Sequence, residues 1–226
     1  MAKGAADGVL QVMLAVRNAA ANPYENDVLE ELTRSSQTVR NAVSEIVMGL
    51  QGHFEAQKEC DSAIETVQKS HATLNKERSA QPYHVTKKKI DTGTIDLLTS
   101  LNNLTQLSQN NPDQAGMAAK DVADVIVPLV KSLSEAAGTT TLNGDEILQC
   151  SRDTMNMVIE ALKASKEVAG DRQNPVLQQA LSQSMNRVTQ LVLRLQECVK
   201  QGDASERALD EAMKRIRAVG AVLESN

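Results

Sequence analysis

The stretch DEILQCSRDTMNMVIEALKASKEV, residues 145–168, shows most openly the pattern that the other segments of the chain repeat. Its large apolar residues recur at helical spacing, in steps of about three, four or seven residues: Ile147, Leu148, Met155, Val158, Ile159, Leu162 and Val168. At about 3.6 residues per turn, this spacing places them in one stripe along a helix. Small residues such as Cys150 and Ala161 lie between them and allow close approach of a neighbouring helix. The stretch therefore predicts an amphipathic helix that packs against other helices.

The composition of the whole chain favours an all-helical protein. The 226 residues include no Trp, one Phe and two Tyr, while 41% are apolar, so any core must be aliphatic. The 11 Gly and 5 Pro fall almost everywhere between periodic segments. This balance is typical of helical bundles and not of β-sandwiches or α/β sheets.

Charge and hydropathy argue against nucleic-acid and membrane-spanning proteins. The net charge is −5 and the pI is near 5.3, whereas phosphate binding needs a basic face. No apolar run approaches the roughly 18 residues of a transmembrane helix, and the N-terminus lacks the apolar region of a signal peptide. We expect a cytoplasmic protein in which Cys60, Cys150 and Cys198 are reduced core residues, because they are odd in number, far apart and at apolar or small positions.

The periodic segments predict about eight helices, over residues 5–21, 26–50, 55–76, 84–109, 111–138, 145–168, 175–200 and 203–223. Gly52 and His53 are predicted to form a turn between the second and third of these helices. Pro128 lies inside the fifth, where a missing backbone donor predicts a kink near residues 124–127 or a break. The polar stretch GTTTLNG, residues 138–144, is the preferred domain boundary.

An internal repeat suggests how these helices group into tandem up-and-down bundles. VLEELTRSSQ at residue 28 reads like VLQQALSQSM at residue 176, and CDSAIETV (60–67) reads like LDEAMKRI (209–216), an offset of about 148 residues. This register predicts a five-helix bundle over residues 1–140, in which helices 2–5 form the core and the first helix can be peripheral. Residues 141–226 then form a second bundle of three helices, which can be incomplete. The alternative is two four-helix bundles divided near Asn110.

The sequence offers no arrangement typical of an enzyme or a metal carrier. His53, His71 and His84 do not share a ligand spacing with cysteine or carboxylate on one helix face. The chain has no glycine-rich phosphate loop, no nucleophile elbow, no HExxH and no Glu-x-x-His pair of a di-iron bundle. We therefore expect no catalytic site, no cofactor and no bound metal.

Two basic patches have a simple interpretation as solvated helix faces. The run Lys87–Lys89 lies near the start of one predicted helix, and Lys214, Arg215 and Arg217 lie on the last. Acidic residues are interspersed nearby and the total charge is negative, which favours solvation over binding. Contact of Lys87–Lys89 with actin or anionic lipid is the alternative.

Three passages resemble the rod of talin, a mechanical adaptor of the cytoskeleton that is built from tandem four- and five-helix bundles. They are NPYENDVLEELTRSSQTVRNAVSEIVMGLQGHFEAQKECDSAI (22–64), AGMAAKDVADVIVPLVKSLSEAAG (115–138) and ILQCSRDTMNMVIEALKASKEVAGDRQNP (147–175). The run QKECDSAI, residues 57–64, and the order of the segments contribute most to the likeness. Together the passages cover 96 of the 226 residues.

This resemblance implies a non-enzymatic adaptor that passes tension between integrin adhesions and actin, with some helices acting as cryptic binding sites for vinculin. Vinculin is then the candidate partner, actin and integrin-adhesion proteins are reached through the full-length protein, and the location is the cytoskeleton at cell–matrix adhesions. The alternative from another class is an unrelated helical-bundle interaction module, such as a vinculin- or catenin-like domain or a coiled-coil assembly factor.

Three helix faces fit the loose pattern of vinculin-binding helices that the resemblance implies. The best fit consists of Leu148, Met155, Val158, Ile159 and Leu162, beside the small pair Cys150-Ser151. The second consists of Val122, Ile126, Leu129 and Leu133, after Ala118-Ala119 and with Pro128 as a departure. The third consists of Val39, Val43 and Ile46. Every helix of a bundle carries such a stripe, so a purely structural role is the alternative for each face.

Overall fold

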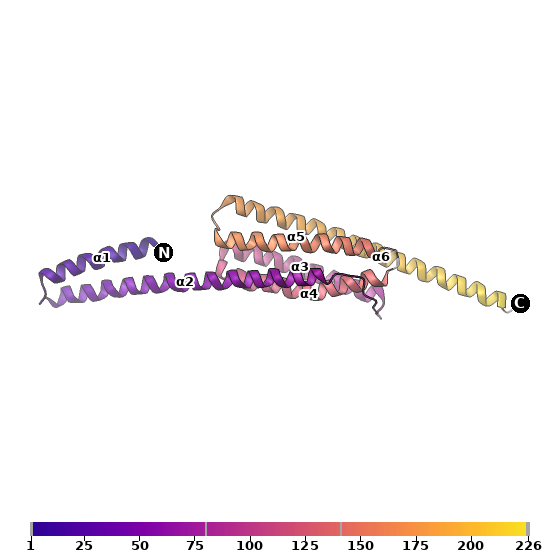
Figure 1. Cartoon of the computed structure of the whole chain (residues 1–226), viewed down its shortest axis with the longest axis horizontal. Helices are drawn as coiled ribbons and strands as arrows, with labels where there is room; N and C mark the ends of the chain where they lie inside the picture. Colours follow the sequence, from indigo (N-terminus) through magenta and orange to yellow (C-terminus); the bar gives the residue numbers. More distant parts are fainter. Residues whose placement is uncertain (1, 80, 141, 225–226) are drawn as a thin grey trace. The chain divides into compact units, whose positions relative to one another are not determined.

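The computed structural model describes residues 2–79, 81–140 and 142–224, and the side chains of residues 6–218 within these ranges. The described residues form helices joined by short connections, without a β-strand, so the predicted all-α class is confirmed (Figure 1). The elements are α1 (Ala2–Ala21), α2 (Asn26–Ala72), α3 (Tyr83–Asn110), the 3₁₀ turn η1 (Pro112–Gln114), α4 (Ala115–Thr139), α5 (Gly144–Gly170) and α6 (Pro175–Glu224).

The number of helices predicted from the sequence is wrong, because two pairs of predicted helices are continuous. The described chain has six α-helices instead of about eight. Helix α2 runs through Gly52 and His53, where a turn was predicted, and α6 runs through Gly202. A helical glycine costs only about 1 kcal/mol relative to alanine, and the flanking helix-forming residues outweigh that cost. No described glycine has the positive φ that would end a helix.

Helix α4 is also uninterrupted at its proline. Pro128 lies inside the helix, which continues from Ala115 to Thr139, so the predicted break does not occur. The Ser132 hydroxyl donates a hydrogen bond to the Pro128 carbonyl oxygen at 3.1 Å, one turn further along. The helix on both sides of the proline is packed in the core, and this packing offsets the lost backbone hydrogen bond.

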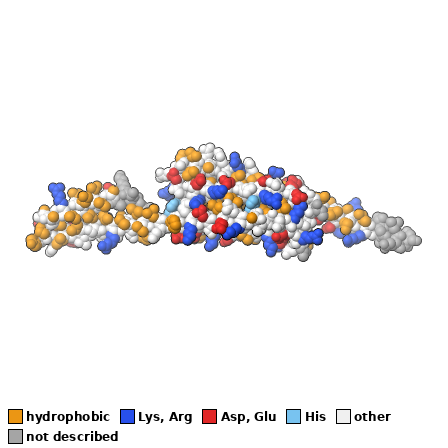
Figure 2. Space-filling view, viewed as in Figure 1, with side chains coloured by type: hydrophobic (Ala, Val, Ile, Leu, Met, Phe, Trp, Pro, Cys, Tyr) orange, Lys and Arg blue, Asp and Glu red, His pale blue; other side chains and the backbone are white. Residues whose placement is uncertain are grey.

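The residues group into two compact units, one up to Glu55 and one from Ala56 onward, with the boundary inside α2. In the first unit, α1 lies alongside the N-terminal part of α2 (Figure 1). A Cβ atom at Gly8 would lie 3.1 Å from a Val39 methyl carbon, and Ala15 is buried. Two helices bury only one face of each other, so many apolar side chains of this unit stay exposed, as the orange surface in Figure 2 shows.

The second unit is a bundle of five helical segments: residues 56–72 of α2, then α3, α4, α5 and the first part of α6. Helix α3 packs on α4, α5 on α6 and α4 on α5, and α3 also contacts α5 and α6. Consecutive helices are joined by short loops and therefore run antiparallel. The core is aliphatic, as predicted, and its largest fully buried side chains are Val67, Ile90, Leu97, Leu101, Leu104, Ile126, Leu133, Ile147, Met155, Leu162, Leu181 and Leu195.

The division of the chain into residues 1–140 and 141–226 stays a prediction about folding units. In the structure, α3 and α4 pack against α5 and α6, on the other side of residue 140. Helices α4 and α5, on either side of this division, are therefore in contact with each other.

Candidate functional site

The face of α5 that fits the vinculin pattern best lies in the core of the second unit. Its five predicted residues have exposed fractions between 0% and 7%: Leu148, Met155, Val158, Ile159 and Leu162. Helix α5 packs against α4 on one side and α6 on the other, with α3 also in contact. The structure therefore brings these five side chains together and removes them from solvent.

The buried hydroxyl groups of α5 differ in whether they have a hydrogen-bond partner. The hydroxyls of Ser151 and Thr154 donate to the carbonyl oxygens one turn earlier, Ile147 at 2.6 Å and Cys150 at 2.7 Å. The hydroxyl of Ser165 is buried and has no hydrogen-bond partner among the described residues. An unpaired buried hydroxyl costs about 1–3 kcal/mol, so burial of α5 is less favourable than its apolar area alone would suggest.

The second predicted face, on α4, is buried to the same degree. Val122, Ile126, Leu129 and Leu133 have exposed fractions of 0–2% and belong to the same core as the α5 face. Small residues Ala118 and Ala119 are buried beside them. The third predicted face differs, because Val39 and Ile46 are half-buried and Val43 is 49% exposed in the first unit.

Polar contacts tie both ends of α5 to residues of α2 and of the segment that follows it. The Gln57 side-chain amide donates to the Lys166 carbonyl oxygen at 3.1 Å, and the Lys166 ammonium pairs with Asp61. At the other end of α5, the Lys76 ammonium lies 2.9 Å from the Asp145 carboxylate. These ion pairs are largely exposed and contribute only about 0–1 kcal/mol each. These polar contacts help to hold α5 in position, while the buried apolar face contributes most of the stability.

The segment after α2 is held against the bundle by its backbone. The Glu77 amide donates to the Ser134 carbonyl oxygen at 3.1 Å, and an Arg152 guanidinium nitrogen lies 3.4 Å from the Leu74 carbonyl oxygen. A Cβ atom at Gly138 would overlap the Glu77 backbone, so only glycine allows this approach. Gly138, the first residue of the predicted domain boundary, thus serves as a packing position.

Tyr83 links α3 to α6 through a buried hydrogen bond. Its hydroxyl donates to the Val199 carbonyl oxygen at 2.9 Å, although Val199 lies inside a helix. Burial, together with the carboxylates of Asp203 and Glu206, raises the pKa of Tyr83 well above its ordinary value. The phenol therefore stays protonated as a donor throughout the physiological range.

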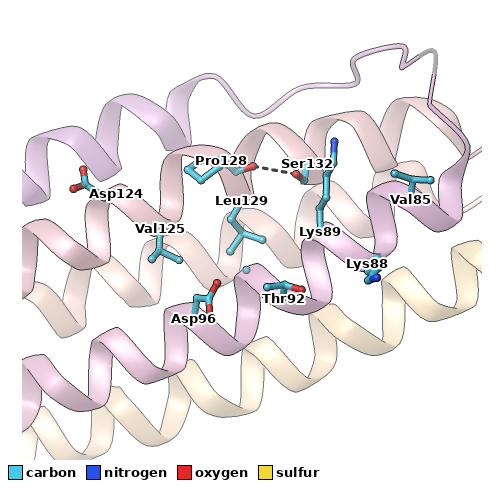
Figure 3. Close-up of a pocket in the computed structure, with 11 residues that line it drawn as sticks. Val85, Lys88, Lys89, Thr92, Asp96, Asp124, Val125, Pro128, Leu129 and Ser132 are labelled. Carbon is cyan, nitrogen blue, oxygen red and sulfur yellow. Dashed lines mark hydrogen bonds between the residues drawn. The ribbon is translucent and has the colours of Figure 1, made fainter.

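An open groove lies between α3 and α4 and has a volume of about 570 Å³ (Figure 3). Its apolar lining includes Val125 and Leu129, and Gly93 leaves space because a Cβ atom there would lie 3.2 Å from Leu129. Lys88 and Asp96 contribute charges at its edges. These lining residues form no nucleophile–base pair or metal-ligand set, and their apolar members offer a surface for packing.

No group of three or more His, Cys, Asp or Glu side chains that could hold a metal ion occurs in the described part of the chain. Burial raises the pKa of the Cys60 thiol to about 11, with Asp61 and Glu59 adding to the effect and Lys166 opposing it. Among helices of the described ranges, none is long and apolar enough to span a bilayer.

The basic patches are partly engaged by neighbouring side chains. The Lys87 ammonium lies 2.9 Å from the Asp91 carboxylate, and Lys89 donates to the Gln81 side-chain oxygen at 2.8 Å. On α6, Arg215 lies 3.5 Å from Glu211. These contacts agree with the interpretation of both patches as solvated helix faces.

One close contact was not predicted from the sequence. The sulfur atoms of Cys150 on α5 and Cys198 on α6 lie 3.1 Å apart, although 48 positions separate the residues. All three cysteines are free thiols and buried, as expected for core cysteines. The periodic pattern places each cysteine on the inner face of its own helix, but no local signal indicates that two of them meet.

The fold and the buried faces define the class of the protein: a helical-bundle module whose apolar helix faces are buried in the core. Residues 56–202 match the family described as the Talin IBS2B domain, which is more than half of the chain. The chain belongs to this family. The match confirms the resemblance to the talin rod. A comparison with curated proteins finds no match. The matched range begins where the second compact unit begins.

Proposed function

We propose that this chain is a tension-bearing segment of a cytoskeletal adaptor, located at cell–matrix adhesions, in which α5 is a cryptic binding helix for vinculin. Membership of the talin family supports the adaptor role. The observation that carries the proposal is the burial of the five-residue α5 face, of which Ile159 is the most exposed at 7%. A partner with a helix-accepting groove reaches this face only after α5 leaves the bundle.

The energetics of the bundle allow such a release. Each large aliphatic side chain of the face contributes roughly 1.5–3 kcal/mol by burial, before the entropy of ordering is subtracted. The net stability of a domain is only about 5–15 kcal/mol, so a competing groove that buries the same side chains can shift the equilibrium. The unpaired Ser165 hydroxyl lowers the cost of release further, since it regains a partner in water. Helix α4, with Ile126 at its centre, is the second candidate.

The experiment compares binding of purified vinculin head to the full chain and to variants that open the bundle. Leu101 lies on α3 and is fully buried, so Leu101→Ala is expected to destabilise the bundle by about 2–5 kcal/mol and to increase binding. Ile95→Ala is the matched control on the same helix, because Ile95 is 61% exposed. Equal binding by the wild type and Leu101→Ala, at a temperature at which only the variant is partly unfolded, would contradict the cryptic site.

A second substitution assigns the binding helix. Val158→Asp, combined with Leu101→Ala, places a carboxylate in the α5 face and is expected to abolish the added binding. Ile126→Asp in the same background is expected to leave it in place. The reverse pattern would assign the site to α4, and loss of binding with neither would exclude both helices.

A further inference from the structure

Two buried thiols meet at the interface between α5 and α6, and nothing in the adaptor role uses them. Cys150 is 2% exposed and Cys198 is 4% exposed, and their sulfur atoms lie 3.1 Å apart. A disulfide has sulfur atoms about 2.0 Å apart, so bond formation requires an approach of about 1 Å. Among the described residues, this is the one contact between cysteine sulfur atoms.

The pair lies near the end of the bundle. Cys150 is within two turns of Gly144, where α5 begins, and Cys198 is about one turn before Asp203. Asp203 is the last buried residue of α6 in the described side chains, because later ones are half-exposed or exposed. Bundle ends open locally at lower free energy than the centre, so an opening of one or two turns exposes both thiols without unfolding the core.

We propose that Cys150 and Cys198 are a redox modification site at which a peroxide forms a reversible disulfide that staples α5 to α6. One thiolate attacks the peroxide, giving a sulfenic acid and hydroxide, and the proton released when the thiol ionised converts the hydroxide to water. The second thiol then displaces the sulfenic hydroxyl as water, forming the sulfur–sulfur bond. In total, two thiols lose two protons and two electrons, and one hydrogen peroxide molecule becomes two water molecules.

The intact bundle protects the thiols and so makes oxidation depend on opening. Burial, with the hydrogen bond to Cys150, raises the pKa of Cys198 to about 12, and the thiolate is the reactive species. A closed bundle therefore reacts slowly. When the end opens, water and peroxide reach the sulfur atoms, and reclosure returns the second thiol to contact distance for the displacement step.

The bond would act on the helix that the adaptor role assigns to partner binding. It closes a loop between residues 48 positions apart, which constrains the unfolded chain and prevents α5 from separating from α6. The oxidised protein therefore keeps the α5 face hidden under conditions that release it from the reduced protein. This consequence rests on the proposed function, whereas formation of the bond does not.

The first test uses the full chain, oxidised with hydrogen peroxide and compared with protein kept in a phosphine reductant. Alkylation in denaturant is expected to count three free thiols in the reduced protein and one after oxidation, with the chain monomeric on a non-reducing gel. The melting temperature is expected to rise by about 5–15 °C and to return on reduction. Three remaining thiols, a covalent dimer, or an unchanged melting temperature would each overturn the proposal.

Matched variants identify the residues. Cys60→Ser removes the third thiol and is expected to leave oxidation and the rise in melting temperature intact. Cys198→Ala is expected to lose both the disulfide and the rise in melting temperature. Each protein is compared with its own reduced form, so a lower stability of this variant does not affect the comparison. Loss of the effect in Cys60→Ser would assign the bond to another pair and overturn the proposal.

Vinculin head binding separates the two proposals. Reduced Leu101→Ala is expected to bind and oxidised Leu101→Ala to bind at least tenfold less, with full recovery on reduction. Equal binding in both states would remove the regulatory consequence. If neither state binds although the disulfide forms, the adaptor's vinculin site fails and the redox site stands.

Discussion

Helices α5 and α1 carry the same kind of apolar stripe, yet one stripe is buried and the other is exposed. In α5, Met155, Val158 and Leu162 are at most 1% exposed. In α1, Leu10 is 60% exposed and Met13 is 64% exposed. Helix α5 packs against α3, α4 and α6 and has polar contacts with α2, whereas α1 lies alongside the N-terminal part of α2 in its own unit.

The difference shows that periodicity determines which face of a helix is apolar but not whether that face is covered. A stripe with a width of about 100° or more needs several neighbours to exclude water from it. In the second unit, five helical segments supply those neighbours. In the first unit, two helices leave most of the apolar surface in solvent. The free energy that an apolar stripe contributes therefore depends on the helices that cover it. A buried face becomes accessible when those helices separate.

The largest expected effect comes from shortening one leucine in each of these two helices. Leu162→Ala leaves a cavity in the core and is expected to lower the free energy of unfolding of the second unit by about 2–5 kcal/mol. Leu14→Ala, on a side chain that is 60% exposed in α1, is expected to change stability by no more than about 0.5 kcal/mol. Urea denaturation followed by circular dichroism measures both. Similar losses for the two variants would mean that the α1 stripe is covered as well.

Two glycines give the next largest contrast. In Gly138→Ala, the new methyl group would overlap the Glu77 backbone and push away the segment whose amide bonds Ser134, at an expected cost of about 1–3 kcal/mol. A Cβ atom at Gly49, in the first unit, meets no other atom within 4 Å. Gly49→Ala is therefore expected to stabilise its helix by up to about 1 kcal/mol. Thermal unfolding reports the two opposite signs, and destabilisation by Gly49→Ala would contradict the open surroundings of that position.

A smaller effect is expected from the two tyrosines. Tyr83→Phe removes the donor to the Val199 carbonyl oxygen and is expected to cost about 1–2 kcal/mol, whereas Tyr24→Phe, at a site 95% exposed, is expected to be neutral. The pKa of Tyr83 is raised above the ordinary value of 10.0, so its contribution is present below pH 10 and is lost as pH rises further. Unfolding of both variants at pH 7 and above pH 10 tests this. A Tyr83→Phe difference that grows with pH would have the wrong sign.

The helix faces could be predicted from the sequence because they depend on local spacing alone. The nine residues assigned to the α4 and α5 faces are all buried, and the aliphatic core follows from the near absence of aromatic residues. The turn at Gly52 was wrong because a glycine signals a possible helix end and the neighbouring residues decide the outcome. The break that was one of the outcomes predicted at Pro128 is absent for a related reason, because residues on both sides of the proline pack in the core.

Contacts between distant residues could not be predicted from spacing. The meeting of Cys150 with Cys198, and of Tyr83 with Val199, depends on how far each helix slides along its neighbour. A shift by one turn, about 5.4 Å, would separate either pair while keeping every apolar residue on its inner face. The exposure of α1 could not be predicted either, because its sequence has the same periodicity as a helix that is covered by several neighbours.

The smallest effect is expected for an ion pair on the solvent-exposed face of the bundle. Side chains there should contribute as little to stability as the exposed side chains of α1. The hydrogen bond and charge of Lys69, 2.7 Å away, hold the pKa of the Glu65 carboxyl below its ordinary value of 4.5. A lowered folded-state pKa means that this contribution is present above about pH 4.5 and is lost as pH falls through the folded-state value. Lys69→Met is expected to return the Glu65 pKa towards 4.5 in an NMR titration, without a measurable change in melting temperature at pH 7, because an exposed pair is screened by solvent. Added salt should do the same to the wild type. A fall in melting temperature comparable with that of Tyr83→Phe would show instead that surface charge, and not the covered apolar face, distinguishes the stable unit from the exposed one.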